Sequence, residues 1–153
     1  KIGNNNLFMS YVHVAHDCII KNNTIFVGYS GIAGHVEVDD YAIVGAYSAA
    51  HQFCKIGKHC LLTHAAIVVK DVVPFTIVSG NPAKLGGINK VGLSRRGYSK
   101  EEIRDILRCY RIIFRNNLTT EEAISTMKAE ISSQNVVEDM TSSLANSTRG
   151  IIR

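Results

Sequence analysis

An apolar residue occupies every sixth position through the first half of the chain. The series comprises Ile2, Phe8, Val14, Ile20, Phe26, Ile32, Val38, Val44, Ala50, Ile56, Leu62 and Val68. An α-helix cannot keep a period of six on one face, because its turn holds 3.6 residues. Hexapeptide repeats keep a period of six on one face when they form a parallel β-helix. Each short strand there turns one aliphatic side chain inward, and three strands complete a coil. The pattern predicts a left-handed parallel β-helix with about four coils of about eighteen residues each.

The residue four positions after each apolar one is usually small or β-branched, and we expect these residues to fill the tight inner corners. They are Thr24, Ser30, Val36, Ala42, Ser48, Cys54, Cys60, Ala66 and Val72. Pro74 stands where the next apolar residue is due. Because proline has no N–H for a sheet, we expect the β-helix to occupy residues 1–74. Residues 75–98 are rich in Gly, Asn and Lys and are interpreted as a connecting loop.

Capping signals and apolar stripes predict a small C-terminal α-helical domain over residues 99–153. Ser99 with Glu102, and Thr119 with Glu122, form capping boxes that begin two helices. The stripe expected on the first helix consists of Ile103, Ile106, Leu107, Tyr110, Ile113 and Phe114. The inner face expected on the second consists of Ala123, Ile124, Met127 and Ile131. A third, weaker helix is expected over about 135–146, and the final "STRGIIR" predicts no element.

Composition adds limits on class and location. A length of 153 residues suits one or two small domains, and the first residue, Lys1, falls inside the repeat. We therefore expect a C-terminal portion of a longer protein or a processed product. No secretory signal opens the chain, so we expect a cytoplasmic protein with reduced thiols. Cys54 and Cys60 are expected to be small core residues rather than metal ligands.

The net charge of +4 is unevenly distributed. Residues 1–74 contain five basic and five acidic side chains, whereas residues 75–153 contain twelve basic and eight acidic ones. This asymmetry favours an acidic partner that binds the second half. Four arginines share one face of the first predicted helix: Arg104, Arg108, Arg111 and Arg115. That face is either a docking surface or an ordinary solvated surface.

The period of the repeat brings separated polar residues together. Residues eighteen apart lie above one another on successive coils, about 4.8 Å apart. The residues predicted to meet on one edge are His16, Asp17, Gly34, His35, His51, Gln52 and Phe53. A histidine can serve as a general base, and the N–H of a glycine can stabilise an oxyanion. The alternative is that the turns of a β-helix simply carry polar residues.

A zinc site is a second alternative, because zinc enzymes also use this type of solenoid. His59 and His64 are spaced like two ligands of the γ-class carbonic anhydrases. The third histidine of that family lies about two coils upstream, where this sequence has Asn23 and no histidine. His13 and His16 are expected to point to different faces. We therefore predict no bound metal.

Five ordered segments carry a family resemblance: "VHVAHDC", "IAGHVEVDDYAIVGAYSAAHQFCKIG", "SGNPAKLGGIN", "GLSRRGYS" and "STRGIIR". Together they resemble the bacterial UDP-N-acetylglucosamine O-acyltransferases, which catalyse the first step of lipid A synthesis. The resemblance extends from about residue 3 to residue 153. Members of the family carry further N-terminal β-helix coils that are absent from this sequence.

The resemblance implies a reaction and its residues. His16 would deprotonate the 3-hydroxyl of UDP-N-acetylglucosamine, which then attacks a 3-hydroxyacyl thioester on acyl carrier protein. Asp17 would orient His16, and the Gly34 N–H would hold the oxyanion. The positions that match substrate-contacting residues are His13, His35, His51, Gln52, Asn89, Arg95 and Arg96, of which the last three match residues near the UDP group. The resemblance also implies a homotrimer with sites between neighbouring subunits, and no metal or other cofactor.

Two positions qualify the resemblance. Pro82 stands where the family commonly has a histidine. His64 falls where the acyl pocket of the family ends, a position that is often glycine. Either the bulk of His64 shortens the acyl chain that is accepted, or the acyl chain is routed past it. Two rival functions remain: the N-acyltransferase that uses the same carrier later in lipid A synthesis, and a non-catalytic scaffold.

Overall fold

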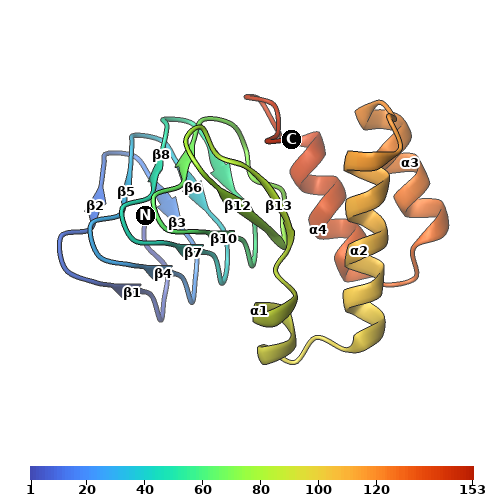
Figure 1. Cartoon of the computed structure of the whole chain (residues 1–153), viewed down its shortest axis with the longest axis horizontal. Coiled ribbons are helices and arrows are strands. Elements are labelled where there is room, and N and C mark those ends of the chain that lie inside the picture. Colours follow the sequence, from blue (N-terminus) through green and yellow to red (C-terminus); the bar gives the residue numbers. More distant parts are fainter.

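The computed structural model describes residues 1–153 and contains a parallel β-helix followed by a small α-helical domain (Figure 1). The β-helix is built from two-residue strands. They are β1 (Leu7–Phe8), β2 (His13–Val14), β3 (Ile19–Ile20), β4 (Ile25–Phe26), β5 (Gly31–Ile32), β6 (Glu37–Val38), β7 (Ile43–Val44), β8 (Ala49–Ala50), β9 (Lys55–Ile56), β10 (Leu61–Leu62) and β11 (Ile67–Val68). The predicted solenoid is confirmed.

The strands form three sheets that are the walls of the β-helix. The six-stranded sheet has the order β1-β4-β7-β10-β12-β13, in which β12 is Thr76–Ser79 and β13 is Lys84–Ile88. The four-stranded sheet has the order β11-β8-β5-β2, and the three-stranded sheet has the order β3-β6-β9. Strands pair in parallel with the strand one coil away, as in His13↔Gly31 and Val14↔Ile32. The eighteen-residue offset of these pairs is the coil length that the period of six predicts.

The predicted inward residues form the core of the β-helix. The apolar residues at every sixth position from Ile20 to Val68 are all buried. The small or β-branched residues predicted to fill the corners are also buried: Thr24, Ser30, Val36, Ala42, Ser48, Cys54, Cys60, Ala66 and Val72. Ile2 and Phe8, in the first coil, remain exposed. Burial raises the pKa of the Cys54 thiol to about 11 and that of Cys60 to about 12. Both cysteines are therefore protonated core residues, as predicted.

Three corners join the sheets. The His16 corner comprises residues 16–17, 34–35 and 52–53, the His59 corner comprises 22–23, 40–41 and 58–59, and the tyrosine corner comprises 10–11, 28–29, 46–47 and 64–65. The second residue of each pair has a left-handed backbone, for example φ 58° at Asp17 and 62° at Tyr29. Side chains at these positions stack from coil to coil, with ring centroids 4.8 Å apart for Tyr11 and Tyr29.

The last coil differs from the prediction, because the β-helix does not end at Pro74. The chain lacks two residues between Val68 and Val72 relative to the preceding coil, so Val72 pairs with Ile56. Val78 then lies beside Leu62. The inward position expected at residue 74 is thus filled by Val72, and the β-helix continues to β12 (Thr76–Ser79).

The predicted connecting loop over 75–98 is also wrong, because most of it is regular structure. β12 pairs in antiparallel orientation with β13 (Lys84–Ile88), and α1 (Lys90–Arg95) follows. Gly and Asn suggested a loop, but here Gly87 adopts φ 109° within β13 and Asn89 caps α1. These residues do form turns and caps, but the turns connect short strands and a helix instead of forming one long loop.

The C-terminal domain contains α2 (Lys100–Arg115), α3 (Thr120–Glu130) and α4 (Gln134–Ala145). Both predicted capping boxes are present, and the third helix is confirmed. The predicted stripe on α2 is partly wrong: Cys109 and Ile112 are buried, whereas Leu107 and Tyr110 are only half-buried. Contacts with both α3 and α4 select this face. None of the helices combines the length and apolar character that a membrane span requires.

The final residues return to the β-helix, which the sequence did not predict. Asp71 and Ile151 form a parallel bridge, and Ile152 is buried in the β-helix core. The Asp71 carboxylate accepts hydrogen bonds from the Lys55 N–H (2.8 Å) and from the Ser147 hydroxyl (2.7 Å). The helical domain is thereby attached to the last coil at both of its ends.

Candidate active site

The backbone of the His16 corner holds the predicted polar residues in vertical register. The His35 N–H donates to the His16 carbonyl (3.0 Å), and the Phe53 N–H donates to the Gly34 carbonyl (3.2 Å). Three successive coils thus present residues 16–17, 34–35 and 52–53 along one edge. The edge lies between the four-stranded and three-stranded sheets (Figure 1).

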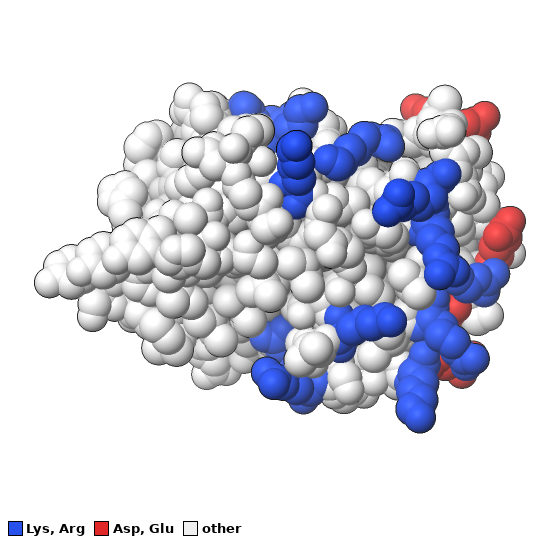
Figure 2. Space-filling model, in the orientation of Figure 1, with Lys and Arg blue, Asp and Glu red and all other residues white.

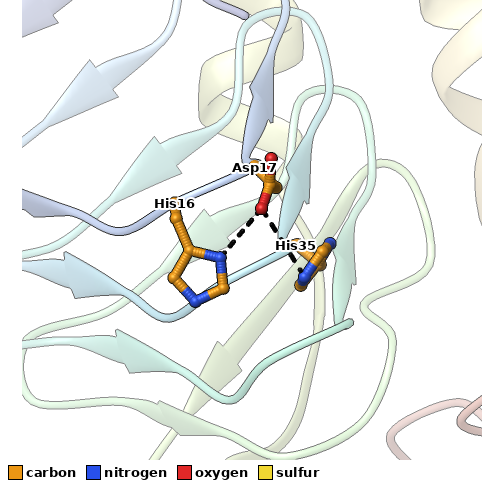
Figure 3. Close-up of side chains that lie close together, drawn as sticks. All are labelled: His16, Asp17 and His35. Atoms are coloured by element: carbon orange, nitrogen blue, oxygen red, sulfur yellow. Dashed lines mark hydrogen bonds and ion pairs between the residues drawn. The ribbon is translucent and has the colours of Figure 1, made fainter.

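His16 and Asp17 form a hydrogen-bonded pair at this corner (Figure 3). The distance from His16 Nδ1 to Asp17 Oδ2 is 2.9 Å. An ionised carboxylate can only accept, so Nδ1 carries the proton and Nε2 keeps a free lone pair. The hydrogen bond from His16 and the neighbouring His35 hold the pKa of Asp17 below its usual range. A histidine whose Nδ1–H is held by a carboxylate has the geometry of a general base with an orienting partner.

His35 extends the pair to the next coil. Its Nε2 lies 3.8 Å from Asp17 Oδ2, and its ring meets His16 edge-on with centroids 5.2 Å apart. The opposite face of the His35 ring stacks on Phe53 at 4.7 Å. His35 is therefore fixed from two sides while its edge remains at the surface.

Gly34 lies against the imidazole of His16. A Cβ atom at position 34 would come within 2.6 Å of His16 Cε1 and 2.7 Å of Nε2. The absence of a side chain therefore allows the ring to lie across this backbone. The Gly34 N–H donates to no protein group, so it is available to an oxygen of a ligand.

Three further predicted residues lie near this corner. His13 is exposed on β2, three residues before His16. His51 and Gln52 are exposed one coil above Gly34, and His51 Nδ1 lies 3.3 Å from the Gln52 carbonyl oxygen. The structure therefore brings together His16, Asp17, Gly34 and His35, with His13, His51 and Gln52 around them.

Asn89, Arg95 and Arg96 lie elsewhere, next to the His59 corner. The Asn89 side chain donates to the His59 carbonyl (3.0 Å) and accepts from the Gly92 N–H (3.2 Å). Asn89 is buried and caps α1, so within one chain its amide is occupied. Arg96 Nη1 lies 3.3 Å from His59 Nδ1, whereas Arg95 is exposed. One chain alone does not unite these residues with His16.

His64 lies at the third corner, the tyrosine corner. It is exposed, and its ring meets Tyr47 edge-on with centroids 5.5 Å apart. Pro82 is exposed in the turn between β12 and β13. Neither residue contacts the His16 corner within one chain, so a role for His64 beside His16 requires a second subunit.

Comparison with known families identifies the fold and its group. A family model described as "Udp N-acetylglucosamine O-acyltransferase; Domain 2" matches residues 71–152, which is more than half of the chain. The chain belongs to the UDP-N-acetylglucosamine O-acyltransferase family. A model of bacterial transferase hexapeptide repeats also matches residues 1–34.

Individual relatives within the UDP-N-acetylglucosamine O-acyltransferase family agree. The acyl-[acyl-carrier-protein]–UDP-N-acetylglucosamine O-acyltransferase of Aliivibrio salmonicida is 47% identical over 99% of this chain and 58% of its own length. That of Thiobacillus denitrificans is 42% identical over 100% of this chain and 59% of its own. The crystal structure of the enzyme from Moraxella catarrhalis matches with a TM-score of 0.96 and 38% identity, over 99% of this chain and 59% of that one. The chain thus spans about three fifths of the length of these UDP-N-acetylglucosamine O-acyltransferases.

The candidate site of this family member is open when one chain is considered. The side chains of His16 and Asp17 are 72% and 66% exposed. Two clefts of this chain lie elsewhere: one of about 340 Å³ between the three-stranded sheet and α4, and one of about 540 Å³ beside the C-terminal tail. Neither cleft is lined by His16 or Asp17.

His16, Asp17 and His35 are also the only group whose ligand atoms lie close enough together to hold a metal ion, within 4.8 Å of one another. A formed zinc site needs each ligand atom about 2.0–2.2 Å from the ion, with a fourth ligand from protein or water. His16 Nδ1 and Asp17 Oδ2 are already hydrogen-bonded to each other at 2.9 Å. The geometry favours a proton-transfer pair.

One residue that the sequence suggested only as a zinc ligand has a different environment. His59 is 3% exposed, and its ring stacks on Tyr41 with centroids 4.8 Å apart. Burial, together with the charges of Arg96 and Lys58, lowers the pKa of His59 to about 4. The eighteen-residue spacing from Tyr41 was the signal that could have identified this position as a corner residue.

Proposed function

We propose that this chain is the catalytic and C-terminal part of a cytoplasmic acyltransferase. It moves a 3-hydroxyacyl chain from acyl carrier protein to the 3-hydroxyl of UDP-N-acetylglucosamine, the first step of lipid A synthesis. The observation that carries the proposal is the His16–Asp17 pair held over Gly34, in a member of a family whose named relatives use these two substrates. No cofactor is needed for this acyl transfer.

His16 acts as the general base. Asp17 accepts from Nδ1–H and leaves the Nε2 lone pair directed outward, so Nε2 takes the proton of the sugar 3-hydroxyl. The resulting alkoxide attacks the thioester carbonyl carbon of the acyl carrier. The carboxylate of Asp17 stabilises the imidazolium that forms.

Gly34 and His16 complete the transfer. The tetrahedral intermediate has a negative oxygen, and the free Gly34 N–H donates to it. The intermediate collapses when its carbon–sulfur bond breaks. His16 then returns the proton to the departing thiolate, which leaves the carrier with a free thiol and the sugar with an ester. His13, His35, His51 and Gln52 line the approach and donate to polar groups of the substrates.

The chemistry of the outer faces supports a homotrimer. The outward residues of β1, β4, β7 and β10 in the six-stranded sheet are apolar: Leu7, Ile25, Ile43 and Leu61. Those of the four-stranded sheet lack carboxylates and lysines, whereas the three-stranded sheet carries Glu37 and Lys55. Figure 2 shows that one side of the β-helix is free of charged side chains over most of its length. Two adjacent uncharged faces suit a ring in which each subunit packs one face against the other face of its neighbour.

Such a ring has a consequence for the site. The four-stranded and six-stranded sheets meet at the tyrosine corner, which would point toward the threefold axis. The His16 corner of one subunit then adjoins the His59 corner of the next. Arg95 and Arg96 of one subunit would bind the pyrophosphate that joins uridine to the sugar held at His16 of another. The exposure of His16 in a single chain agrees with this arrangement.

The arginines of α2 provide a surface for the carrier. Arg104, Arg108, Arg111 and Arg115 are all exposed, and Figure 2 shows basic side chains gathered over the helical domain. Among them, the one ion pair joins Arg108 to Asp105, at 3.6 Å. Most of this positive charge is therefore free to attract an acidic carrier protein.

The test is acyl transfer from 3-hydroxyacyl carrier protein to UDP-N-acetylglucosamine by the full-length protein. We expect activity that a His16→Ala variant loses by a factor of about 10³, with an unchanged trimer and melting temperature. A well-folded full-length trimer without activity would refute the proposal. Transfer to an amine of a later intermediate instead of the 3-hydroxyl would favour the N-acyltransferase.

A further inference from the structure

We infer that His59 is a positioning residue that orients Arg96 for the substrate phosphate groups. The inference rests on the proposed function, because it assumes that Arg96 binds the pyrophosphate of the sugar nucleotide. His59 itself is buried and does not reach the surface where a substrate would bind. It acts through the guanidinium of Arg96.

The contact between the two side chains has a defined direction. Arg96 Nη1 lies 3.3 Å from His59 Nδ1. A guanidinium only donates, so His59 Nδ1 must accept and the ring proton must reside on Nε2. The remaining N–H groups of Arg96 stay free to make paired hydrogen bonds to phosphate oxygens. His59 thus fixes one edge of the guanidinium and leaves another available.

Burial keeps His59 in the form that can accept. The ring is enclosed by the parallel faces of Tyr41 (4.8 Å) and Phe75 (5.8 Å) and by the edge of Tyr98 (5.1 Å). Burial and the neighbouring positive charges of Arg96 and Lys58 lower its pKa to about 4. The imidazole is therefore neutral at physiological pH, and its lone pair is available to Arg96.

Tyr41 supports the same guanidinium from a second direction. The Arg96 Cζ atom lies 5.2 Å from the centroid of the Tyr41 ring, which is a cation–π distance. Tyr41 and His59 stack with parallel planes on successive coils. The two rings therefore form a rigid shelf on which Arg96 rests, and the coil spacing sets its geometry.

The backbone of His59 also fixes the helix that carries Arg96. Its carbonyl accepts from Asn89 Nδ2 (3.0 Å), and Asn89 Oδ1 in turn accepts from the Gly92 N–H of α1. Arg96 directly follows α1. His59 therefore contacts the arginine both through its ring and through the cap of the preceding helix. If His59 only filled space in the core, its side chain would not need a hydrogen-bond acceptor at the position of Nδ1.

Two substitutions separate the acceptor from the packing. His59→Phe keeps the aromatic stack and removes the acceptor, whereas His59→Asn loses the stack and keeps an acceptor near Nδ1. In the full-length protein we expect the Phe variant to raise the KM for UDP-N-acetylglucosamine by about tenfold with little change in the KM for the carrier. The Asn variant should retain a KM within about threefold of wild type despite a lower melting temperature. His59→Leu replaces the Phe variant if that protein does not fold.

A double-mutant cycle makes the positioning role specific. Arg96→Ala should raise the KM for UDP-N-acetylglucosamine, and adding His59→Phe should raise it no further. A folded Phe or Leu variant with an unchanged KM, or an effect that persists in full without Arg96, overturns the inference. Nitrogen NMR of the wild-type chain tests it without substitution: a proton on His59 Nδ1 would also overturn it. If Arg96→Ala leaves the KM unchanged, the assignment of Arg96 to the nucleotide fails first.

Discussion

The imidazole of His16 lies across the α-carbon of Gly34, one coil away, in space that any side chain at position 34 would occupy. The same ring donates to Asp17. A backbone position therefore helps to set the orientation of the proposed base, in addition to offering its own N–H.

Gly34→Ala should disable the site without unfolding the chain. The new Cβ would lie 2.6 Å from His16 Cε1, and the exposed ring can relieve the contact by rotating away from Asp17. We expect kcat to fall by about 10²-fold, because misplacement of a catalytic group by about 1 Å has effects of this size. Gly86→Ala is the control, since its Cβ would have an ordinary contact at 3.4 Å. Equal activity of the two variants would contradict this role for Gly34.

Asp17→Asn should remove the base by reversing its tautomer. The amide can donate to His16 Nδ1, which places the ring proton on Nε2 and leaves no lone pair for the sugar hydroxyl. We expect kcat to fall by at least about 10²-fold with the KM values nearly unchanged. Asp39→Asn, which breaks a partly exposed ion pair with Lys21 at 2.9 Å, should change kcat less than twofold. Comparable losses in both variants would argue against a special role for Asp17.

Charge reversal on α2 should weaken binding of the carrier alone. Arg108→Glu with Arg111→Glu replaces two exposed cations with anions, so we expect the KM for the carrier to rise at least tenfold at low salt. The effect should shrink as ionic strength increases. Lys128→Glu on α3 is the control for a single exposed charge. A rise that does not depend on salt would indicate a structural role for the arginines.

His64→Gly should extend the range of acyl chains accepted. In the proposed trimer, the tyrosine corner lies inside the assembly, so removing the imidazole beside Tyr47 opens space there. We expect kcat/KM for longer 3-hydroxyacyl carriers to rise relative to shorter ones, by about 10-fold for the extra methylenes. Competition assays with carriers of graded length measure this ratio. An unchanged preference would mean that the chain is routed past His64.

His59 should make the fold sensitive to acid over a defined range. Its pKa is about 4 in the folded chain, below the ordinary value of 6.5, so the unfolded chain binds more protons between these values. Stability is therefore full above about pH 6.5 and falls as the pH drops toward 4, by about 3 kcal/mol from this residue. Burial is the main cause, while Arg96 and Lys58 add to it and Asp39 and Asp40 oppose it. Urea unfolding at several pH values should show a weaker acid dependence in His59→Phe.

The periodic part of the fold could be predicted from sequence because each repeat meets the same constraints. Ile32 and Val38 lie on successive strands of one coil, and each is buried because its strand turns one side chain into the core. The period of six is therefore directly visible in the sequence. The hairpin of β12 and β13 could not be predicted in this way. Gly87 and Asn89 suggest turns, but the two-residue deletion before Val72 determines which strand each turn follows.

The part of the candidate site that depends on the spacing between successive coils could be predicted from the sequence. His16, Gly34 and His35 meet because they are one coil apart, and their contacts have the expected register. The surroundings of His59 were not predictable, because Arg96 reaches it from a different part of the chain. Contacts between separate elements depend on packing rather than on period. The same limitation explains the wrong stripe on α2, where α3 and α4 decide which side of the helix is buried.

The shortened coil connects Val68 to Val72 through residues 69–71, whereas the coil before it uses residues 51–55 to connect Ala50 to Ile56. The shortened corner continues the column of Asp17, His35 and Phe53, and the C-terminal tail pairs with it at Asp71. The helical domain is therefore anchored to the same edge that carries the proposed base. A carrier bound to α2 would deliver its thioester across a fixed span, so the length of its flexible arm, rather than a moving domain, would determine whether the thioester carbonyl carbon reaches the sugar hydroxyl at His16.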